Sequence, residues 1–246
     1  MKMTKAGILA LCLCAAPRMV LAQTMQWTDK GYAGVNVGGQ IGSHTLETAS
    51  TFSLYDETAS VSTSQKPGGG FLFDIGGAYR VYGKNLLAGL SYSHTSSDSD
   101  VAINASLPHP LFFDQPRNVS STQSGAKHSE NVVHLAAIWM MPVANKLDVG
   151  IFGGPSIFAV EQDTVETVTV TETADLAHPA VSAPLNRVSK TTVGVNFGAD
   201  VQYMITKRYG VGGLARVALG SVSIPGAKDS LGVGGFQLAV GGRVRF

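Results

Sequence analysis

The chain has 246 residues, of which 14% are charged and 44% are hydrophobic, and its formal net charge is +1. A cytosolic domain carries about a quarter charged residues, so this composition is unusual for one. The near-neutral balance gives no indication of nucleic acid as a partner. Both cysteines, Cys12 and Cys14, lie close to the N-terminus, so the chain beyond them has no disulfide and no Cys-based metal site.

The first segment is predicted to be a secretory signal peptide covering residues 1–22. Lys2 and Lys5 form its positive start, residues 6–16 are apolar, and Ala22 ends a small-residue cleavage site. The apolar run is too short to span a bilayer, and no later run approaches the ~18 residues of a transmembrane helix. Residues 23–246 are then expected to form a single exported domain.

From residue 31 onward, the sequence repeatedly places apolar, uncharged residues at alternate positions. Successive side chains of a strand point to opposite faces, so each such segment predicts a strand with one apolar face. Eight segments have about the 9–11 residues that a tilted strand needs to cross a bilayer. Their apolar positions fall within residues 33–41, 71–79, 86–92, 133–139, 147–157, 193–203, 211–219 and 236–246.

The opposite positions of the same strands carry the polar and charged residues. An Arg or Lys that faced lipid at mid-bilayer would cost about 2–4 kcal/mol, so a membrane enforces this sorting. Charges inside a barrel must be paired or hydrated, and we therefore expect an interior network of ion pairs and hydrogen bonds. Its predicted members are Asp74, Arg80, His134, Asp148, Asp200, Arg216, Arg243 and Arg245.

The connections between the strands alternate between long and short. Short turns at one end and long loops at the other are the layout of bacterial outer-membrane barrels, with turns in the periplasm and loops outside. The predicted fold is therefore all-β, a closed antiparallel up-and-down transmembrane barrel of eight strands. Residues 100–107 and 165–173 also alternate, and we interpret them as strands that continue above the membrane. A ten-stranded barrel with one extra hairpin is the alternative.

Aromatic residues gather at the short-turn ends of different strands. Barrels place such residues at the membrane interfaces, so this group predicts a girdle at the periplasmic side. The predicted girdle consists of Tyr32, Tyr79, Trp139, Tyr203, Tyr209 and Phe246.

Three short motifs carry a resemblance to a known family. They are Ile-Phe-Gly-Gly-Pro at 151–155, Thr-Lys-Arg-Tyr-Gly at 206–210 and the closing Gly-Arg-Val-Arg-Phe at 242–246. The chain resembles the small outer-membrane barrels of the OmpA-type transmembrane domain and the opacity-type surface proteins. The resemblance implies that Phe246 belongs to the signal read by the outer-membrane assembly machinery. No residue follows Phe246, so we do not expect the peptidoglycan-binding domain or its cell-wall tethering.

The expected role is structural or adhesin-like, in contact with outer-membrane lipid and lipopolysaccharide. A narrow channel for small solutes or ions is the alternative, because charged residues could line a path. A lipid A-modifying enzyme is a weaker one: His94 and Ser96 share a strand face, but no acid is clearly placed to complete a nucleophilic site. His128, Ser129 and Glu130 form a still weaker group. We therefore expect no enzymatic activity. A soluble, lipocalin-like binder is the main non-membrane alternative.

The second long loop contains Leu111, Phe112 and Phe113 among prolines. Such residues could form an exposed tip that meets a cell-surface ligand. They could instead fold back over the barrel mouth, which is the more frequent fate of large apolar side chains. The six histidines have no metal-binding spacing, and no cofactor is expected.

Overall fold

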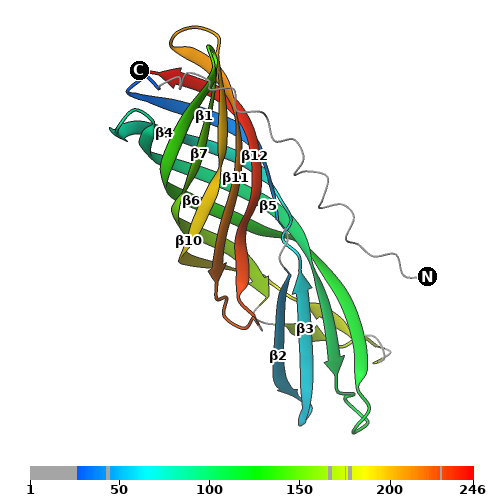
Figure 1. The fold of residues 1–246 in the computed structure, drawn as a ribbon. Helices are drawn as coiled ribbons and strands as arrows, with labels where there is room; N and C mark the ends of the chain where they lie inside the picture. The colour runs from blue at the N-terminus through cyan, green and yellow to red at the C-terminus, as the bar shows by residue number, and fades with distance from the viewer. Residues whose placement is uncertain (1–26, 43–44, 166–167, 175, 177–178, 228) are drawn as a thin grey trace, which may run out of the picture.

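The computed structural model describes residues 27–42, 45–165, 168–174, 176, 179–227 and 229–246. The predicted signal peptide lies outside these residues. Among them, no helix is long and apolar enough to cross a membrane. Eight long strands make up most of the described chain (Figure 1). They are β1 (Gly31–Ile41), β4 (Phe71–Tyr82), β5 (Leu86–Leu107), β6 (Arg117–Ala144), β7 (Leu147–Val165), β10 (Leu185–Met204), β11 (Tyr209–Val222) and β12 (Leu231–Arg245).

These eight strands close into one antiparallel ring. Each pairs with the long strand before it and the long strand after it. The ring closes where β1 meets β12, in a register that runs from Tyr32↔Arg245 to Ile41↔Phe236. Two backbone hydrogen bonds between Gly31 and Phe246 extend this seam to the last residue. The prediction of a closed, up-and-down barrel of eight strands is confirmed.

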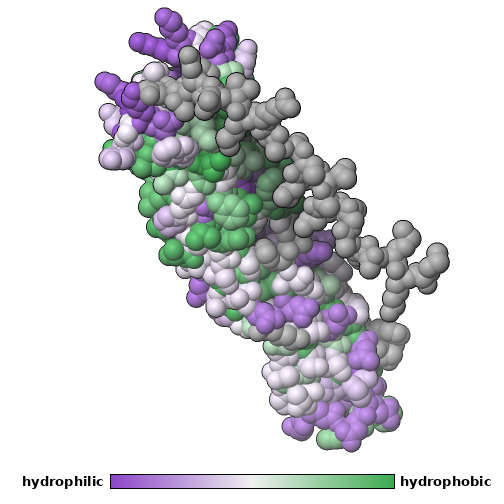
Figure 2. Space-filling model, in the orientation of Figure 1, coloured by the Kyte–Doolittle hydropathy of each residue, from purple (hydrophilic) through white to green (hydrophobic). Residues whose placement is uncertain are grey.

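The two faces of the wall differ sharply in polarity. In β12, Phe236, Leu238 and Val240 point away from the barrel and are 41%, 48% and 66% exposed, whereas Arg243 and Arg245 are 2% and 6% exposed. The same alternation holds around the ring, so apolar side chains cover the outside of the barrel. Figure 2 shows this apolar band over the half of the molecule nearer to the C-terminus.

Beyond the band, β5 and β6 continue out of the ring together and carry a second body. We call it the extension (Figure 1). A hairpin of β2 (Leu46–Leu54) and β3 (Glu57–Gln65) pairs with β5 from Ser60↔Ser106 to Gln65↔Val101. The hairpin therefore widens the sheet above the ring and does not enter it, so the ten-stranded barrel is wrong.

The long connections expected from the sequence, residues 43–69, 95–129 and 161–190, are largely strand where the structure describes them. Residues 95–129 continue β5 and β6 around a tip at 108–116, which confirms the strand predicted at 100–107. The expectation for 165–173 is wrong in part, because β7 ends at Val165 and β8 (Thr169–Thr171) pairs with β9 (Ala180–Ser182) instead.

The extension has an apolar core of its own, separate from the barrel. Small aliphatic side chains of β3, β5 and β6 are packed there, with partly buried residues of β8 and β9 against them. Between β2 and β3, Tyr55 and Asp56 both have positive φ, 53° and 60°. This is the backbone of the two-residue turns whose twist matches that of the paired strands. The core and the tight turn give the extension a defined shape.

Candidate functional site

The barrel interior contains three buried ion pairs, which follow one another along the length of the barrel. Arg216 Nη2 lies 2.9 Å from Asp74 Oδ2, and Arg245 Nη2 lies 2.6 Å from Asp148 Oδ2. Between these two pairs lies the third, in which Nη2 of Arg243 contacts Oδ1 of Asp200. Removing a charge from water costs several kcal/mol, and a partner at hydrogen-bond distance offsets that cost. The structure thus brings together six of the predicted network residues.

Amide side chains link these pairs in the half of the barrel nearer to the short turns. The Oε1 of Gln202 accepts hydrogen bonds from Arg245, and its Nε2 donates to Asp200 at 2.7 Å. The Oδ1 of Asn36 likewise accepts from Arg243 at 2.6 Å. Each amide therefore has its oxygen on a cation and its nitrogen on an acid, which satisfies both groups.

The same alternation of charged groups and amides continues toward the extension. Asn36 donates to Asp74 at 2.8 Å, and Gln237 accepts from Arg216 Nε at 2.6 Å. Gln237 then donates to the Oε1 of Gln40 at 2.6 Å. The Nε2 of Gln40 donates in turn to Glu130 at 3.2 Å.

The network ends at the rim with a group that the sequence analysis did not place there. Glu130 accepts hydrogen bonds from the backbone N–H of Gly234 and lies 3.0 Å from His128 Nε2, while His128 Nδ1 lies 2.7 Å from Gln162 Oε1. Both His128 and Glu130 are buried. The sequence does indicate that these side chains face inward, because His128 and Glu130 occupy alternate positions of β6 in phase with the inward residue His134. Ser129, between them, faces the other way.

A continuous hydrogen-bonded ladder therefore runs from Asp148 near the short turns to Gln162 at the rim. A void inside the barrel, lined by Asp74, Arg216 and Arg243 among others, has a volume of about 70 Å³. That space holds a few water molecules at most. Within the described residues, no group of three or more His, Cys, Asp or Glu could hold a metal ion.

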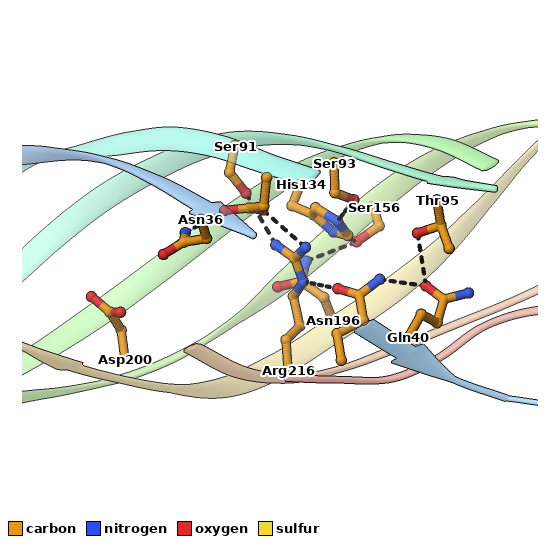
Figure 3. Close-up of polar contacts among 12 residues, drawn as sticks. Asn36, Gln40, Ser91, Ser93, Thr95, His134, Ser156, Asn196, Asp200 and Arg216 are labelled. Carbon is orange, nitrogen blue, oxygen red and sulfur yellow. Dashed lines mark hydrogen bonds and ion pairs between the residues drawn. The ribbon is translucent and has the colours of Figure 1, made fainter. Parts of the chain in front are cut away.

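Two predicted network residues lie apart from the ion pairs. His134 is buried between the hydroxyls of Ser93 and Ser156, at 3.0 and 2.7 Å, on the opposite wall (Figure 3). Arg80 is half-buried, and its Nη1 donates to the backbone oxygen of Trp27 at 3.4 Å. Arg80 therefore belongs to the short-turn end of the barrel and not to the ladder.

Trp27 closes the short-turn end from inside. Its side chain is 1% exposed, Arg245 lies over its ring with Cζ 4.5 Å from the ring centroid, and Tyr32 packs edge-on against it. Tyr32 is 8% exposed, so its assignment to the outer girdle is wrong. The physical reason is strand parity: Ala33 faces outward, and its neighbour must face inward.

The other five aromatic residues assigned to the girdle face outward near the short turns. Their exposed fractions range from 49% for Tyr203 to 61% for Tyr209. The remaining three are Tyr79, Trp139 and Phe246.

His94 and Ser96, the first pair considered for catalysis, lie on the outer face of β5 without a hydrogen bond to each other. His94 Nδ1 lies 2.9 Å from Asn131 Oδ1, and the same oxygen accepts a hydrogen bond from Tyr92. Ser96 is exposed on the outer wall. The contact with Asn131 fixes the orientation of the His94 ring.

The tip of the extension exposes Leu111, Phe112 and Phe113, at 69%, 55% and 73%. The expectation that they fold back over the barrel mouth is wrong, because β5 and β6 carry them far from it (Figure 1). His109 supports this tip: its ring centroid lies 4.8 Å from that of Phe112, and its Nδ1 accepts the backbone N–H of Leu111.

Arg117 holds the base of the tip. Its guanidinium donates to both oxygens of Glu172, at 2.7 and 2.8 Å, and to the carbonyl oxygen of Pro108 at 2.7 Å. Tyr55 donates a further hydrogen bond to Glu172 at 2.9 Å. The bonds from Arg117 lower the pKa of Glu172, and the bond to Glu172 raises the pKa of the Tyr55 phenol. We call these three side chains the clamp.

The fold and the sorted faces define an integral membrane barrel, and the family comparison agrees. The model of the outer membrane protein beta-barrel domain matches residues 6–244. The chain therefore belongs to this family, and it is an integral outer-membrane protein of Gram-negative bacteria. Its short turns face the periplasm and its extension faces the cell exterior. No curated protein matches the chain in sequence.

Solved structures of similar shape have low sequence identity. Neisserial surface protein A is 14% identical over 88% of this chain and 97% of its own, with a TM-score of 0.43. OprG from Pseudomonas aeruginosa is 9% identical over 90% and 99%, with a TM-score of 0.44. Ail of Yersinia pestis, solved with the heparin analogue sucrose octasulfate, is 9% identical over 88% and 99%, with a TM-score of 0.36.

Proposed function

We propose that this protein is a non-enzymatic outer-membrane barrel that binds a partner at the cell surface through the tip of its extension. The observation that carries this proposal is the exposure of Leu111, Phe112 and Phe113 together at the outermost turn. Burying a large apolar side chain is worth about 1.5–3 kcal/mol. Three of them held in water at one point favour a partner with a complementary apolar surface.

The support beneath the tip strengthens this proposal. The extension core and the clamp fix the tip before any partner arrives, so binding does not have to order the loop. Immobilising a flexible side chain or loop costs about 0.5–1.5 kcal/mol per side chain, and a rigid tip avoids part of that cost. A loop that served only to connect β5 and β6 would not need this support.

The barrel interior favours a structural role for the wall over conduction. Its cations are paired with acids, the amides of the ladder are bonded at both ends, and the void beside Arg216 and Arg243 is small. In this proposal, the outer wall contacts outer-membrane lipid and lipopolysaccharide and anchors the extension.

The test uses outer-membrane vesicles that carry the full protein, bound to cell monolayers and to arrays of cell-surface proteins. A variant with Leu111, Phe112 and Phe113 all changed to Ser should lose adhesion while keeping its barrel. The matched control changes Thr58 and Ser62, exposed on the outer face of β3, to Ala and should bind as the wild type does. Equal adhesion of the tip variant and the wild type would refute the proposal.

A further inference from the structure

The periplasmic end of the barrel has an uneven charge. All exposed charged residues at this end, within the described chain, are cations: Lys30, Lys84, Lys146, Lys207 and Arg208. The acid Asp29 is only partly exposed and lies 3.8 Å from Arg245. The extension instead exposes charges of both signs, such as Asp98, Asp100 and Lys127. A cationic rim favours an anionic partner on the periplasmic side.

Two of these cations line the same surface hollow. The turn from β6 to β7 carries Lys146, and the turn from β10 to β11 carries Lys207. Both line a hollow of about 670 Å³ whose lining also includes Trp27, Arg245 and the two acids next to Arg245, Asp29 and Asp148. A backbone hydrogen bond of 2.8 Å from Met204 N to Lys146 O joins the two turns. We call this hollow the turn cleft. Its position is fixed by neighbouring strands, because β7 pairs with β10.

The cations of the turn cleft differ in whether an acid of the protein neutralises them. Arg245 is already bound by Asp148 and stacked on Trp27. Lys146 and Lys207 have no ion-pair partner among the described residues, and both are exposed. Two unneutralised ammonium groups on one hollow form a site for a single anionic group, which could be hydrogen-bonded by both.

The lipid-facing wall continues directly from this cleft. The register Tyr203↔Leu147 places an outward aromatic residue beside Lys146, and Tyr209 follows Lys207 closely on the next strand. Tyr203 and Tyr209 are 49% and 61% exposed. Aromatic residues of barrels lie at the headgroup level, so the ammonium groups beyond them stand where phosphate groups lie.

We infer that the turn cleft binds the phosphate headgroup of an anionic phospholipid from the periplasmic leaflet. Lys146 and Lys207 contact the phosphate, and the acyl chains lie along the apolar wall beside Tyr203. A soluble phosphate would use the two lysines alone and would gain nothing from the wall. The site is independent of the extension, so it holds whether or not the tip binds a partner.

The test places the full protein in nanodiscs of phosphatidylcholine with a minor fraction of phosphatidylglycerol. Native mass spectrometry then measures the lipid that stays bound after extraction. The wild type should retain phosphatidylglycerol in preference to phosphatidylcholine. The variant K146Q/K207Q should lose this preference by at least about fivefold, the effect of one cation near a charged membrane surface. Heat-modifiable migration on a detergent gel checks that each variant keeps its barrel.

The matched control is K30Q/K84Q, which removes the same charge from the same rim away from the cleft. It should retain the preference. An equal loss in both variants would mean general attraction by the rim and would overturn the site. Unchanged retention in K146Q/K207Q would overturn it as well. In a separate arm, inorganic phosphate at millimolar concentration should not displace the bound lipid; full displacement would assign the cleft to soluble phosphate.

Discussion

Gly212 of β11 and Arg243 of β12 lie in contact inside the barrel, and a Cβ added at Gly212 would be 2.8 Å from the Cζ of Arg243. Gly34 of β1 bounds the same guanidinium from the other side, with 2.9 Å between its added Cβ and Arg243 Nη1. The absence of a side chain at these two inward positions therefore makes the space in which Arg243 reaches Asp200. The ion pair depends on residues that carry no charge.

The first prediction follows from this contact. Gly212→Val should displace Arg243 from Asp200 and lower the free energy of unfolding by about 3–5 kcal/mol, the usual cost of breaking a buried ion pair. Denaturant unfolding in detergent micelles measures it. Gly213→Val is the control, because an added Cβ at that position meets nothing within 4 Å. Equal destabilisation by both variants would show that the space around Arg243 is not what matters.

The second prediction concerns the pair Asp74–Arg216. Asp74→Asn leaves the guanidinium of Arg216 buried without a counter-charge and should cost about 3–5 kcal/mol. Adding Arg216→Gln should recover part of that loss, since no unpaired charge then remains. A double-mutant cycle on unfolding free energies measures the coupling, expected at about 0.5–3 kcal/mol. Strictly additive losses would contradict the pairing.

The third prediction distinguishes a plugged barrel from a channel. The wild-type protein in planar bilayers should give no steady unitary conductance, because paired side chains fill its interior. Replacing Arg216 and Asp74 together by Ala removes two large side chains beside the existing void of about 70 Å³ and should raise the leak of small ions. Stable single-channel steps from the wild type would favour the narrow-channel alternative.

The sequence could predict the barrel because a membrane imposes a binary rule on every strand. Apolar side chains must face lipid and charges must face inward, so Arg243 and Phe236 reveal their faces by position alone. The same rule would have placed Tyr32 inside, since it lies one residue before outward Ala33. The interior pairs also follow from the rule, because acids and bases sealed in one narrow space must meet. Which acid meets which base depends on register, which alternation leaves open.

The extension could not be predicted in the same way because water surrounds it. Its strands β2 and β3 need bury only one face, and small or polar residues such as Ala59, Thr63 and Gln65 occupy buried positions there. A run of Ser and Thr then resembles a loop. The clamp could not be predicted from the sequence either, because Tyr55, Arg117 and Glu172 come from three separate connections. The pairing of β3 with β5 brings the first two connections together, and residues of β8 and β9 pack against the core that they form.

The fourth prediction is a pH effect on the clamp. The bonds from Arg117 hold the pKa of Glu172 below its ordinary value. A carboxylate with a lowered pKa in the folded state stabilises the fold above its unfolded-state pKa, and this contribution is lost as pH falls through the folded pKa. Hydrogen exchange at residues 108–117, corrected for intrinsic rates, should therefore rise below about pH 4. Glu172→Gln should show the faster exchange already at pH 7, and a wild-type exchange that does not change with acid would exclude the clamp as a support.

The fifth prediction separates recognition of Phe246 from its structural role. The side chain is 57% exposed, and the contacts that fix the last residue are backbone hydrogen bonds to Gly31, which Phe246→Ala retains. The variant should therefore fold in detergent with the stability of the wild type. In cells it should accumulate poorly in the outer membrane, because the resemblance assigns the final aromatic residue to the assembly signal. Val244→Ala is the control, since Val244 is 43% exposed on the same face of β12. If Phe246→Ala assembled as well as Val244→Ala, the assembly machinery would not read this side chain; if it were unstable in detergent, its role would be structural.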